Sequence, residues 1–480
     1  MSDDRIEHRG DAAINCDVTI IGAGPVGSLL AVLLQDFGVS TVLVERDLQP
    51  YQLPRAIVMD EEIQRVFHQH RMGAWISATT TPLKGADFVS PTGDRILGIE
   101  IPSAGPLGLA PVVCHYQPDL DAFVQTEAER RGSTILRGRT AATLDDSRGE
   151  HIRLTLDNGD TVSSRWLVGC DGASSWTRKQ VGLSLEDLKF DQQWLVVDLE
   201  LHDASRPELP DVLQQVCDPL RPVTYVPGHA RYRRWEFQIQ PDDDLEVVTT
   251  ESGIWSLLEG WVKPADARLV RSAVYRFHAV VAPSMHKGNV FLAGDSAHQM
   301  PPFLGQGLNS GTRDAVSLAW KMALVRHGSA DERLLDTYAV ERVPHVRSTV
   351  EHAADMGRLI DQIAGRESHG LDRSSGYGGS RPQPFIEAGL VVHSDESVGR
   401  PLRFDSDVYA ALVEGGPHFV IATNNNVDAK FGAPTRVVRV ANGLIDDRYA
   451  IVVRPDGVVA AVAHDDDELR SSLRTLEEYL

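Results

Sequence analysis

The chain has 480 residues, of which 42% are hydrophobic and 24% charged, as in soluble globular proteins of about two to four domains. Its formal net charge of -21 argues against nucleic-acid and anionic-membrane partners, because these select basic surfaces. No apolar run reaches the roughly 18 residues of a membrane-spanning helix. The polar N-terminus predicts no secretion signal, and scattered cysteines without a CxxC pair are typical of a reducing compartment, so we expect a cytoplasmic protein.

Residues 16–46 predict a βαβ unit. A short β-branched strand at 18–21 precedes helical apolar spacing over 25–37, and a second strand follows at 41–44. Both strands are apolar throughout, which is typical of a parallel sheet buried on both faces.

A G-x-G-x-x-G motif at 22–27 joins this strand to this helix. Gly22 would make the tight turn, Gly24 would let a pyrophosphate approach the backbone, and Gly27 would let helix and strand pack closely. The helix N-terminus supplies free N–H groups and partial positive charge. Glu45, roughly 20 residues further on, suits a ribose diol without a 2′-phosphate, which indicates FAD or NAD and not NADP.

The next elements mix helices with short strands. Helical patterns cover 60–72 and 119–131, short strand-like pieces occupy 83–113, and 151–169 predicts a hairpin that turns at Asn158-Gly159. The segments 193–201, 222–227, 233–240 and 272–282 then alternate as strands. Such alternation predicts an antiparallel sheet covered on one face, and it favours a long flavin cofactor over the βα alternation of a simple NAD dehydrogenase.

The stretch GDSAHQMPPFLGQGLNSG at 294–311 sets Asp295, a proline pair and four glycines between a buried strand and a helix. Helices are predicted over 311–328 and 331–364. A linker rich in Gly, Ser and Arg follows at 366–385, and a small α/β unit ends the chain. No metal-ligand spacing is present.

Three motifs stand in order: GAGPVG at 22–27, GCDGASSWTR at 169–178 and GDSAHQMPP at 294–302. Together they resemble the class A flavoprotein aromatic hydroxylases of the para-hydroxybenzoate hydroxylase type. The segments LPRAIVMDEEIQRVF and RRWEF look closest to the 3-(3-hydroxyphenyl)propionate hydroxylase branch.

The resemblance implies an α/β fold with three domains. An FAD-binding Rossmann-like domain of the glutathione reductase type would comprise 15–185 and 285–365. An antiparallel-sheet substrate domain would comprise 186–284 with parts of 80–113. After the linker, 386–480 would form a small thioredoxin-like domain, which lacks CxxC.

The resemblance also assigns cofactor contacts. Asp295 would bind the ribityl chain of FAD, Arg55 the pyrophosphate, and Gln117 the ribityl or phosphate region. Asp171-Gly172 would lie near the pyrophosphate and the reduced nicotinamide. The full cofactor set is Gly22, Gly24, Pro25, Val26, Gly27, Glu45, Arg46, Arg55, Gln117, Asp171, Gly172, Asp295, Pro302, Gly305, Gly307, Leu308 and Asn309.

The implied reaction is hydroxylation of a phenolic ring, such as a 3-hydroxyphenylpropionate-like acid, with NADH or NADPH and O2 through a flavin C4a-hydroperoxide. A general base is expected but not identified; His115 and Tyr116 are weak candidates. We expect Tyr225, Trp235, Phe237, Ile239 and Pro302 to line the substrate pocket. A substrate carboxylate could pair with Arg231, Arg233 or Arg234, although a solvated basic face is the simpler interpretation.

Other functions remain open from the sequence. One is a tailoring oxygenase for a larger polycyclic or polyketide phenol, and another is a non-catalytic FAD-binding protein. A flavin halogenase is disfavoured because no W-x-W-x-I-P segment is present. A homodimer is a further expectation.

Overall fold

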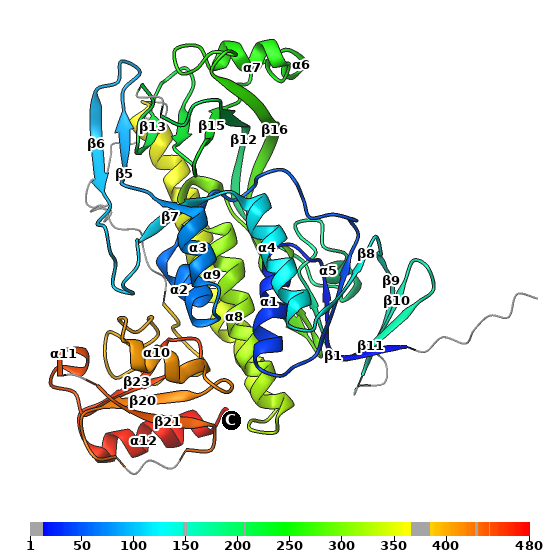
Figure 1. Ribbon diagram of the computed structural model, residues 1–480, viewed down its shortest axis with the longest axis vertical. Helices are drawn as coiled ribbons and strands as arrows, with labels where there is room; N and C mark the ends of the chain where they lie inside the picture. The colour runs from blue at the N-terminus through cyan, green and yellow to red at the C-terminus, as the bar shows by residue number, and fades with distance from the viewer. Residues whose placement is uncertain are drawn as a thin grey trace, which may run out of the picture.

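The structure, a computed structural model, describes residues 13–146, 149, 151–205, 208–365, 385–427, 431–440 and 442–480. Two large sheets and a small C-terminal unit are joined by long helices (Figure 1). All but the last residue of the predicted linker 366–385 lies outside the described residues. None of the helices in these ranges combines the length and apolarity that crossing a membrane requires.

The first sheet contains the predicted βαβ unit. Its main path runs β17-β18-β11-β1-β2-β8, and the pairs β18–β11, β11–β1, β1–β2 and β2–β8 are parallel. Its strands are β1 (Ile14–Ile21), β2 (Thr41–Glu45), β8 (Thr134–Arg137), β9 (Ala141–Asp145), β10 (Ile152–Leu156), β11 (Thr161–Gly169), β17 (His286–Lys287) and β18 (Val290–Leu292). The parallel order brings the carboxyl ends of β1, β2, β11 and β18 to one edge.

Helices cover this sheet because their apolar faces match its buried strands. α1 (Pro25–Asp36) is almost wholly buried and packs against α4 (Gln117–Arg130) and α8 (Gly307–Arg326). Nearby lie β3 (Val58–Asp60), α2 (Glu61–Gln69), α3 (Gly73–Thr79), β4 (Thr80–Pro82), β7 (Val112–His115), α5 (Trp176–Gln180), η1 (Gly294–Ser296) and η2 (Pro302–Leu304).

The second sheet is the predicted antiparallel sheet, in the order β19-β16-β12-β15-β14-β13-β5-β6. One pair, β13–β5, is parallel. Its strands are β5 (Gly85–Val89), β6 (Arg95–Glu100), β12 (Glu186–Leu201), β13 (Leu213–Val216), β14 (Val223–Val226), β15 (Tyr232–Gln238), β16 (Ala267–Val281) and β19 (His298–Gln299), with α6 (Leu245–Val248) and α7 (Glu251–Leu257) beside it. β5 and β6 therefore join this sheet from the first quarter of the chain.

The C-terminal unit is a four-stranded sheet in the order β21-β20-β22-β23. Its elements are α10 (Ser406–Val413), β20 (Phe419–Thr423), β21 (Thr435–Arg439), α11 (Asn442–Ile445), β22 (Ala450–Val453), β23 (Val459–Ala463) and α12 (Asp466–Glu477). It attaches through buried charges: Glu341 of α9 (Arg333–Ile363) accepts hydrogen bonds from Lys321 at 2.7 Å and Arg454 at 2.8 Å. Pairing with these two cations lowers the pKa of Glu341 to about 2.

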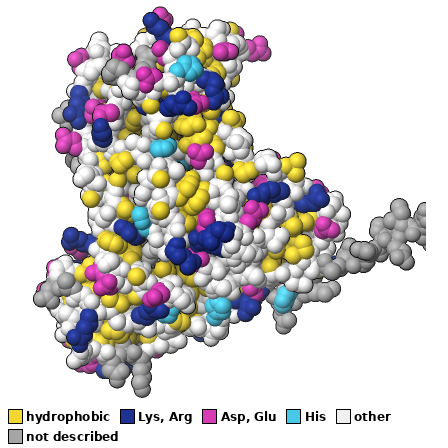
Figure 2. All heavy atoms as spheres, viewed as in Figure 1, with side chains coloured by type: hydrophobic (Ala, Val, Ile, Leu, Met, Phe, Trp, Pro, Cys, Tyr) yellow, Lys and Arg dark blue, Asp and Glu magenta, His cyan; other side chains and the backbone are white. Residues whose placement is uncertain are grey.

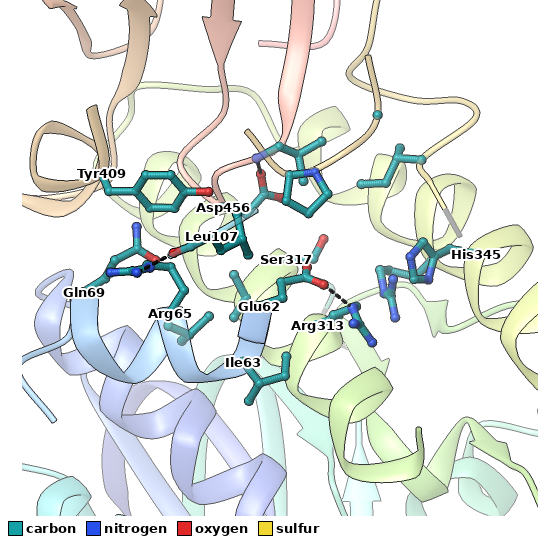
Figure 3. A pocket seen from close by; sticks show the side chains of 17 residues that line it. Glu62, Ile63, Arg65, Gln69, Leu107, Arg313, Ser317, His345, Tyr409 and Asp456 are labelled. Atoms are coloured by element: carbon teal, nitrogen blue, oxygen red, sulfur yellow. Dashed lines mark hydrogen bonds and ion pairs between the residues drawn. The ribbon is translucent and has the colours of Figure 1, made fainter. Parts of the chain in front are cut away.

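A cavity lies between this unit and the helices α2 and α8 (Figure 3). Arg313 and Glu62 pair at its floor at 2.7 Å, while Tyr409 and Asp456 come from the C-terminal side. On the face drawn in Figure 2, acidic and basic side chains are interspersed and not gathered by sign.

Candidate active site

The three sequence motifs meet at the carboxyl edge of the first sheet. The Cys170 N–H donates to the Ile21 carbonyl at 2.8 Å, and the Ala293 N–H donates to the Gly169 carbonyl at 3.0 Å. A Cβ on Gly311 would lie 3.1 Å from the Gly294 Cα. Segments almost 300 residues apart in the chain therefore form one edge, as expected for a ligand crevice of a doubly wound sheet.

The glycines at this edge fall into two kinds. A Cβ on Gly22 would lie 2.4 Å from the Cys170 carbonyl oxygen, and one on Gly27 would lie 2.1 Å from the Gly22 carbonyl oxygen. These two glycines are required by the fold itself. A Cβ on Gly24, Gly172 or Gly307 would meet nothing within 4 Å, so these three leave the backbone open to a ligand.

Two helix N-termini at this edge are uncapped. The N-cap residues of α1 and α8, Gly24 and Gln306, make no side-chain capping hydrogen bond. In contrast, α2 is capped by Asp60, α7 by Thr250 and α12 by Asp465. Free N–H groups and the positive end of a helix dipole attract anions, which fits a pyrophosphate at α1 and an electron-rich ring edge at α8.

Glu45 ends β2 with its carboxylate beside the glycine turn. Oε2 accepts from the Ala23 N–H at 2.7 Å, and Oε1 accepts from the Asp47 N–H at 2.9 Å. A carboxylate has about four lone-pair sites, so both oxygens can still accept from a ribose hydroxyl. Arg46, also in the predicted set, is exposed beside Asp47.

Gln117 contacts the segment that carries Arg55. Its Oε1 accepts from the backbone N–H groups of Arg55 at 3.2 Å and Ala56 at 2.5 Å, and its Nε2 donates to Asp121 at 3.2 Å. The amide therefore holds the Arg55 segment, and one N–H of Nε2 has no hydrogen bond within the described residues. The sequence analysis did not predict Asp121 as a site residue. Burial raises the pKa of its carboxyl to about 7.

Asp171 is a turn carboxylate. It accepts from the Ser175 hydroxyl at 2.5 Å and from the Thr177 N–H and hydroxyl at 2.8 and 3.0 Å. This side chain shapes the turn before α5, and a Cβ on the neighbouring Gly172 would meet nothing within 4 Å.

Asp295 is the carboxylate without such partners. It is exposed, and no hydrogen bond to its side chain occurs within the described residues. Surrounding protein atoms nevertheless raise its pKa by desolvation, while His298 and Arg55 act in the opposite direction. Its backbone is anchored, because the Gly294 N–H donates to buried Asp314 at 2.9 Å. A fixed carboxylate with free lone pairs fits a polyhydroxyl chain.

The remaining segment, 302–309, is also fixed. Gly305 takes a left-handed conformation with φ +62° and ends the short η2 helix that begins at Pro302. Asn309 donates from Nδ2 to the Gly305 carbonyl at 2.7 Å and accepts from the Asp60 N–H at 3.1 Å. Leu308 packs into the main core, so the free N–H groups at the start of α8 are held rigidly.

Four predicted pocket residues pack into an apolar cluster on one side of the second sheet. Tyr225, Trp235 and Phe237 are 0 to 1% exposed and pack with α7, and Ile239 packs against the same cluster. The alternation along β15 was predicted correctly, but both faces of the strand are buried, so the pattern did not show which one meets the cofactor. We call this apolar side the outer face.

The other side, the inner face, carries charged residues. Asp198 of β12 accepts from Arg234 Nε of β15 at 2.7 Å and from Arg271 Nη1 of β16 at 3.3 Å. Arg234 also donates to the Arg55 carbonyl at 2.6 Å, and Arg271 donates to the Pro54 carbonyl. The solvated basic face expected for Arg234 is therefore wrong: it is buried and ties the inner face to the cofactor edge. Arg231 is exposed and pairs with half-buried Glu200, as expected of a solvated residue.

The candidate bases His115 and Tyr116 are poorly placed for catalysis. His115 is 3% exposed, and desolvation lowers the pKa of its imidazole to about 3. Neither ring nitrogen has a partner within the described residues. Tyr116 stacks on Tyr232 with ring centroids 3.7 Å apart, and burial raises the pKa of its phenol. The low pKa makes the histidine a poor proton acceptor, and the tyrosine does not readily ionise.

Comparison with known proteins identifies the class. A family model described as "FAD binding domain" matches residues 15–353. A probable NADH-specific resorcinol 4-hydroxylase of Rhodococcus jostii (strain RHA1) is 37% identical over 508 residues, covering 96% of this chain and 94% of that protein. A 3-(3-hydroxy-phenyl)propionate/3-hydroxycinnamic acid hydroxylase of Mycobacterium avium (strain 104) is 30% identical over 491 residues, covering 94% and 83%. The chain belongs to this family of FAD-binding aromatic hydroxylases.

Solved structures share the fold. The flavin-dependent monooxygenase PieE, in complex with FAD and substrate, superposes with a TM-score of 0.80 at 22% identity, covering 98% of this chain and 100% of that one. Aklavinone-11 hydroxylase with FAD and aklavinone gives 0.79 at 21% identity, covering 97% and 100%. The predicted fold class is confirmed. The chain is an FAD-dependent aromatic monooxygenase that uses a reduced nicotinamide.

Proposed function

We propose that the enzyme hydroxylates a small, uncharged phenol of the resorcinol class, with NADH and O2 as co-substrates. The observation that carries the proposal is the state of the inner face. Both of its buried guanidinium groups, Arg234 and Arg271, are engaged by Asp198 and by backbone carbonyls. Within the described residues, neither of these two guanidinium groups is free to pair with a substrate carboxylate, whereas a neutral phenol needs no such partner.

The likeness to the Rhodococcus protein supports the same choice, and its printed preference supports NADH over NADPH. A reaction that consumes NADH and O2 fits the cytoplasm. A homodimer rests on the family resemblance alone and would be tested by sedimentation.

We propose that FAD is held by the residues predicted from the motifs, with Gly24 and Val26 at the pyrophosphate, Glu45 at the ribose and Asp295 at the ribityl chain. The open space at Gly24 and Gly307 and the two uncapped helices support this assignment. Residues 15–185 and 285–365 would then form the FAD domain, and 186–284 with parts of 80–113 the substrate wall. Residues 386–480 would complete the third domain.

When bound, FAD supplies the hydride-accepting and oxygen-transferring chemistry. The chain's own residues do the rest. Gln117, Arg234 and Arg271 hold the Pro54–Arg55 backbone in place. The start of α8 presents N–H groups to developing negative charge. The inner face of the second sheet positions the phenol and excludes water.

The test is product formation by the FAD-reconstituted protein with NADH and each of three phenols: resorcinol, 3-(3-hydroxyphenyl)propionate and aklavinone. We expect resorcinol to stimulate NADH oxidation and to yield a hydroxylated product. Turnover of the acid alone, or of the polycyclic phenol alone, would contradict the proposed substrate class. A colourless protein that cannot be reconstituted with FAD would contradict the cofactor assignment as well.

A further inference from the structure

Glu236 stands out on the inner face because its buried carboxylate makes only one long ion pair. It is 5% exposed, yet no hydrogen bond to its carboxylate occurs within the described residues. Its nearest cation is Arg234, whose Nη1 lies 3.9 Å from Oε1, beyond hydrogen-bond distance. Asp198, on the same face, accepts three hydrogen bonds from Arg234 and Arg271. Burying a carboxylate without such hydrogen bonds costs free energy. A buried carboxylate of this kind therefore indicates a functional role.

The register of the strands places Glu236 between two cofactor-facing segments. Asp198 pairs with Arg234 in the row that contacts Pro54 and Arg55. Trp194 pairs with Gln238 in the row that contacts Phe303, with ring centroids 5.4 Å apart. Val196 pairs with Glu236 in the row midway between these two.

Like the rest of the inner face, the midway row keeps some solvent access that the outer face lacks. Val196, Glu236 and their cross-strand neighbour Thr224 of β14 are 4, 5 and 7% exposed, whereas Trp235 and Phe237 on the outer face are 0 and 1% exposed. Phe303 follows Pro302 directly, and Arg55 belongs to the predicted pyrophosphate site. A ring bound over the flavin between these segments would meet the Glu236 row.

We propose that Glu236 is the catalytic base, which accepts a hydrogen bond from the substrate phenol and takes its proton as the ring is hydroxylated. The inference rests on the proposed function. In this step the phenol O–H bond breaks, its electron pair stays on the substrate oxygen, and the proton binds a Glu236 oxygen. No redox change accompanies it, because NADH and O2 supply the overall oxidation. The electron pair on oxygen makes the ring a better nucleophile.

The environment of Glu236 suits a base. Burial raises the pKa of its carboxyl, and the charged groups that face it are Arg234 on its own strand, Asp198 on β12 and Arg271 on β16. The two guanidinium groups lower the pKa of Glu236, and the Asp198 carboxylate raises it further. Because the base must be ionised, activity should fall as the pH drops through this raised pKa.

The experiment compares the FAD-loaded wild type with Glu236→Gln, which keeps the shape and removes the base. We expect kcat for the hydroxylated product to fall by about 10²–10⁴-fold. The acidic limb of the kcat/KM profile should disappear. Flavin absorbance should show FAD retained, which separates a lost base from a lost fold.

A binding assay gives a readout that does not depend on turnover. Difference spectroscopy with 4-nitrophenol, corrected for the ionisation of the ligand itself, should show wild-type affinity that changes with pH as Glu236 titrates. In Glu236→Gln the affinity should drop by about tenfold or more and lose that dependence. Glu200→Gln, the same change at an exposed ion pair on β12, should match the wild type throughout.

Two results would overturn the inference, and they are distinguishable. If the wild type turns over resorcinol and Glu236→Gln shows the same kcat and pH profile, Glu236 is not the base and the proposed function stands. If the wild type neither binds 4-nitrophenol nor hydroxylates any phenol, the proposed function fails and the inference fails with it.

Discussion

The two faces of the second sheet are built from alternate residues of the same strands, and they differ sharply. On β15, Trp235 and Phe237 point outward into a sealed apolar cluster under α7. Arg234 and Glu236 point inward, where Arg234 fastens the Pro54–Arg55 backbone and Glu236 has no hydrogen bond. One face thus holds the fold together and the other carries charge to the cofactor edge. Substitutions one residue apart should therefore fail in different ways.

The largest effect is expected on the inner face, from Asp198→Ala. The change leaves Arg234 and Arg271 buried without their carboxylate, and breaking a buried pair in this way costs about 3–5 kcal/mol. It also loosens the guanidinium groups that hold Pro54 and Arg55, so FAD should bind more weakly. Urea unfolding and FAD titration measure both effects. Wild-type stability with normal FAD retention would contradict the proposed link between this face and the cofactor edge.

Phe237→Ala on the outer face should lose a comparable amount of stability but no chemistry. Truncating a buried Phe costs about 3–5 kcal/mol in unfolding free energy. The kcat per bound FAD should stay within about twofold of the wild type, because this side chain faces α7 and not the substrate. Phe237→Leu is the matched control and should recover most of the stability. A selective loss of kcat in the Leu variant would mean that the outer face reaches the substrate.

Asp295→Ala tests the cofactor edge apart from either face. Removing the exposed carboxylate should weaken FAD binding by about 10- to 100-fold, the usual range for a hydrogen bond to a charged group. Stability without FAD should change little, because no hydrogen bond within the described residues depends on this side chain. Fluorescence titration of the apoprotein measures the dissociation constant. An unchanged constant would remove Asp295 from the proposed FAD site.

The smallest effect should be a gain of stability in Glu236→Gln. Because the pKa of Glu236 is raised in the folded protein, its ionised carboxylate opposes folding at neutral pH. This penalty disappears as the pH falls below the pKa that Glu236 has in the unfolded chain. The variant should therefore melt above the wild type near pH 7, with the gap closing in acid. A variant that melts below the wild type at pH 7 would show that Glu236 is structural.

The cofactor edge could be predicted from sequence because its demands are local. Glycine is the only residue type that the turn tolerates at positions 22 and 27. The strand before the turn and the helix after it are encoded in the adjacent residues. His298, from the same motif as Asp295, has a fully buried side chain whose Nε2 lies 2.7 Å from Asp314 Oδ2. The role of Asp295 was also predicted from its motif, and it stays a prediction.

The inner face could not be predicted because it depends on register between distant strands. Asp198, Arg234 and Arg271 come from three strands, and neither the bulge after Asp198 nor the pairing of Glu236 with Val196 is written in any one of them. The role of Gln117 was missed for a similar reason, since its partners at Arg55 and Ala56 lie about 60 residues earlier. The sequence did contain one indication of the inner face: apolar and charged residues alternate along the strand that carries Arg234 and Glu236.

The most direct test is the amount of hydroxylated resorcinol formed per NADH by FAD-loaded wild type, Glu236→Gln and Phe237→Leu, compared at equal flavin concentration. We expect the wild type and the outer-face variant to form product with similar efficiency. The inner-face variant should bind FAD but form little product. Equal product from all three proteins would contradict the division of labour between the two faces.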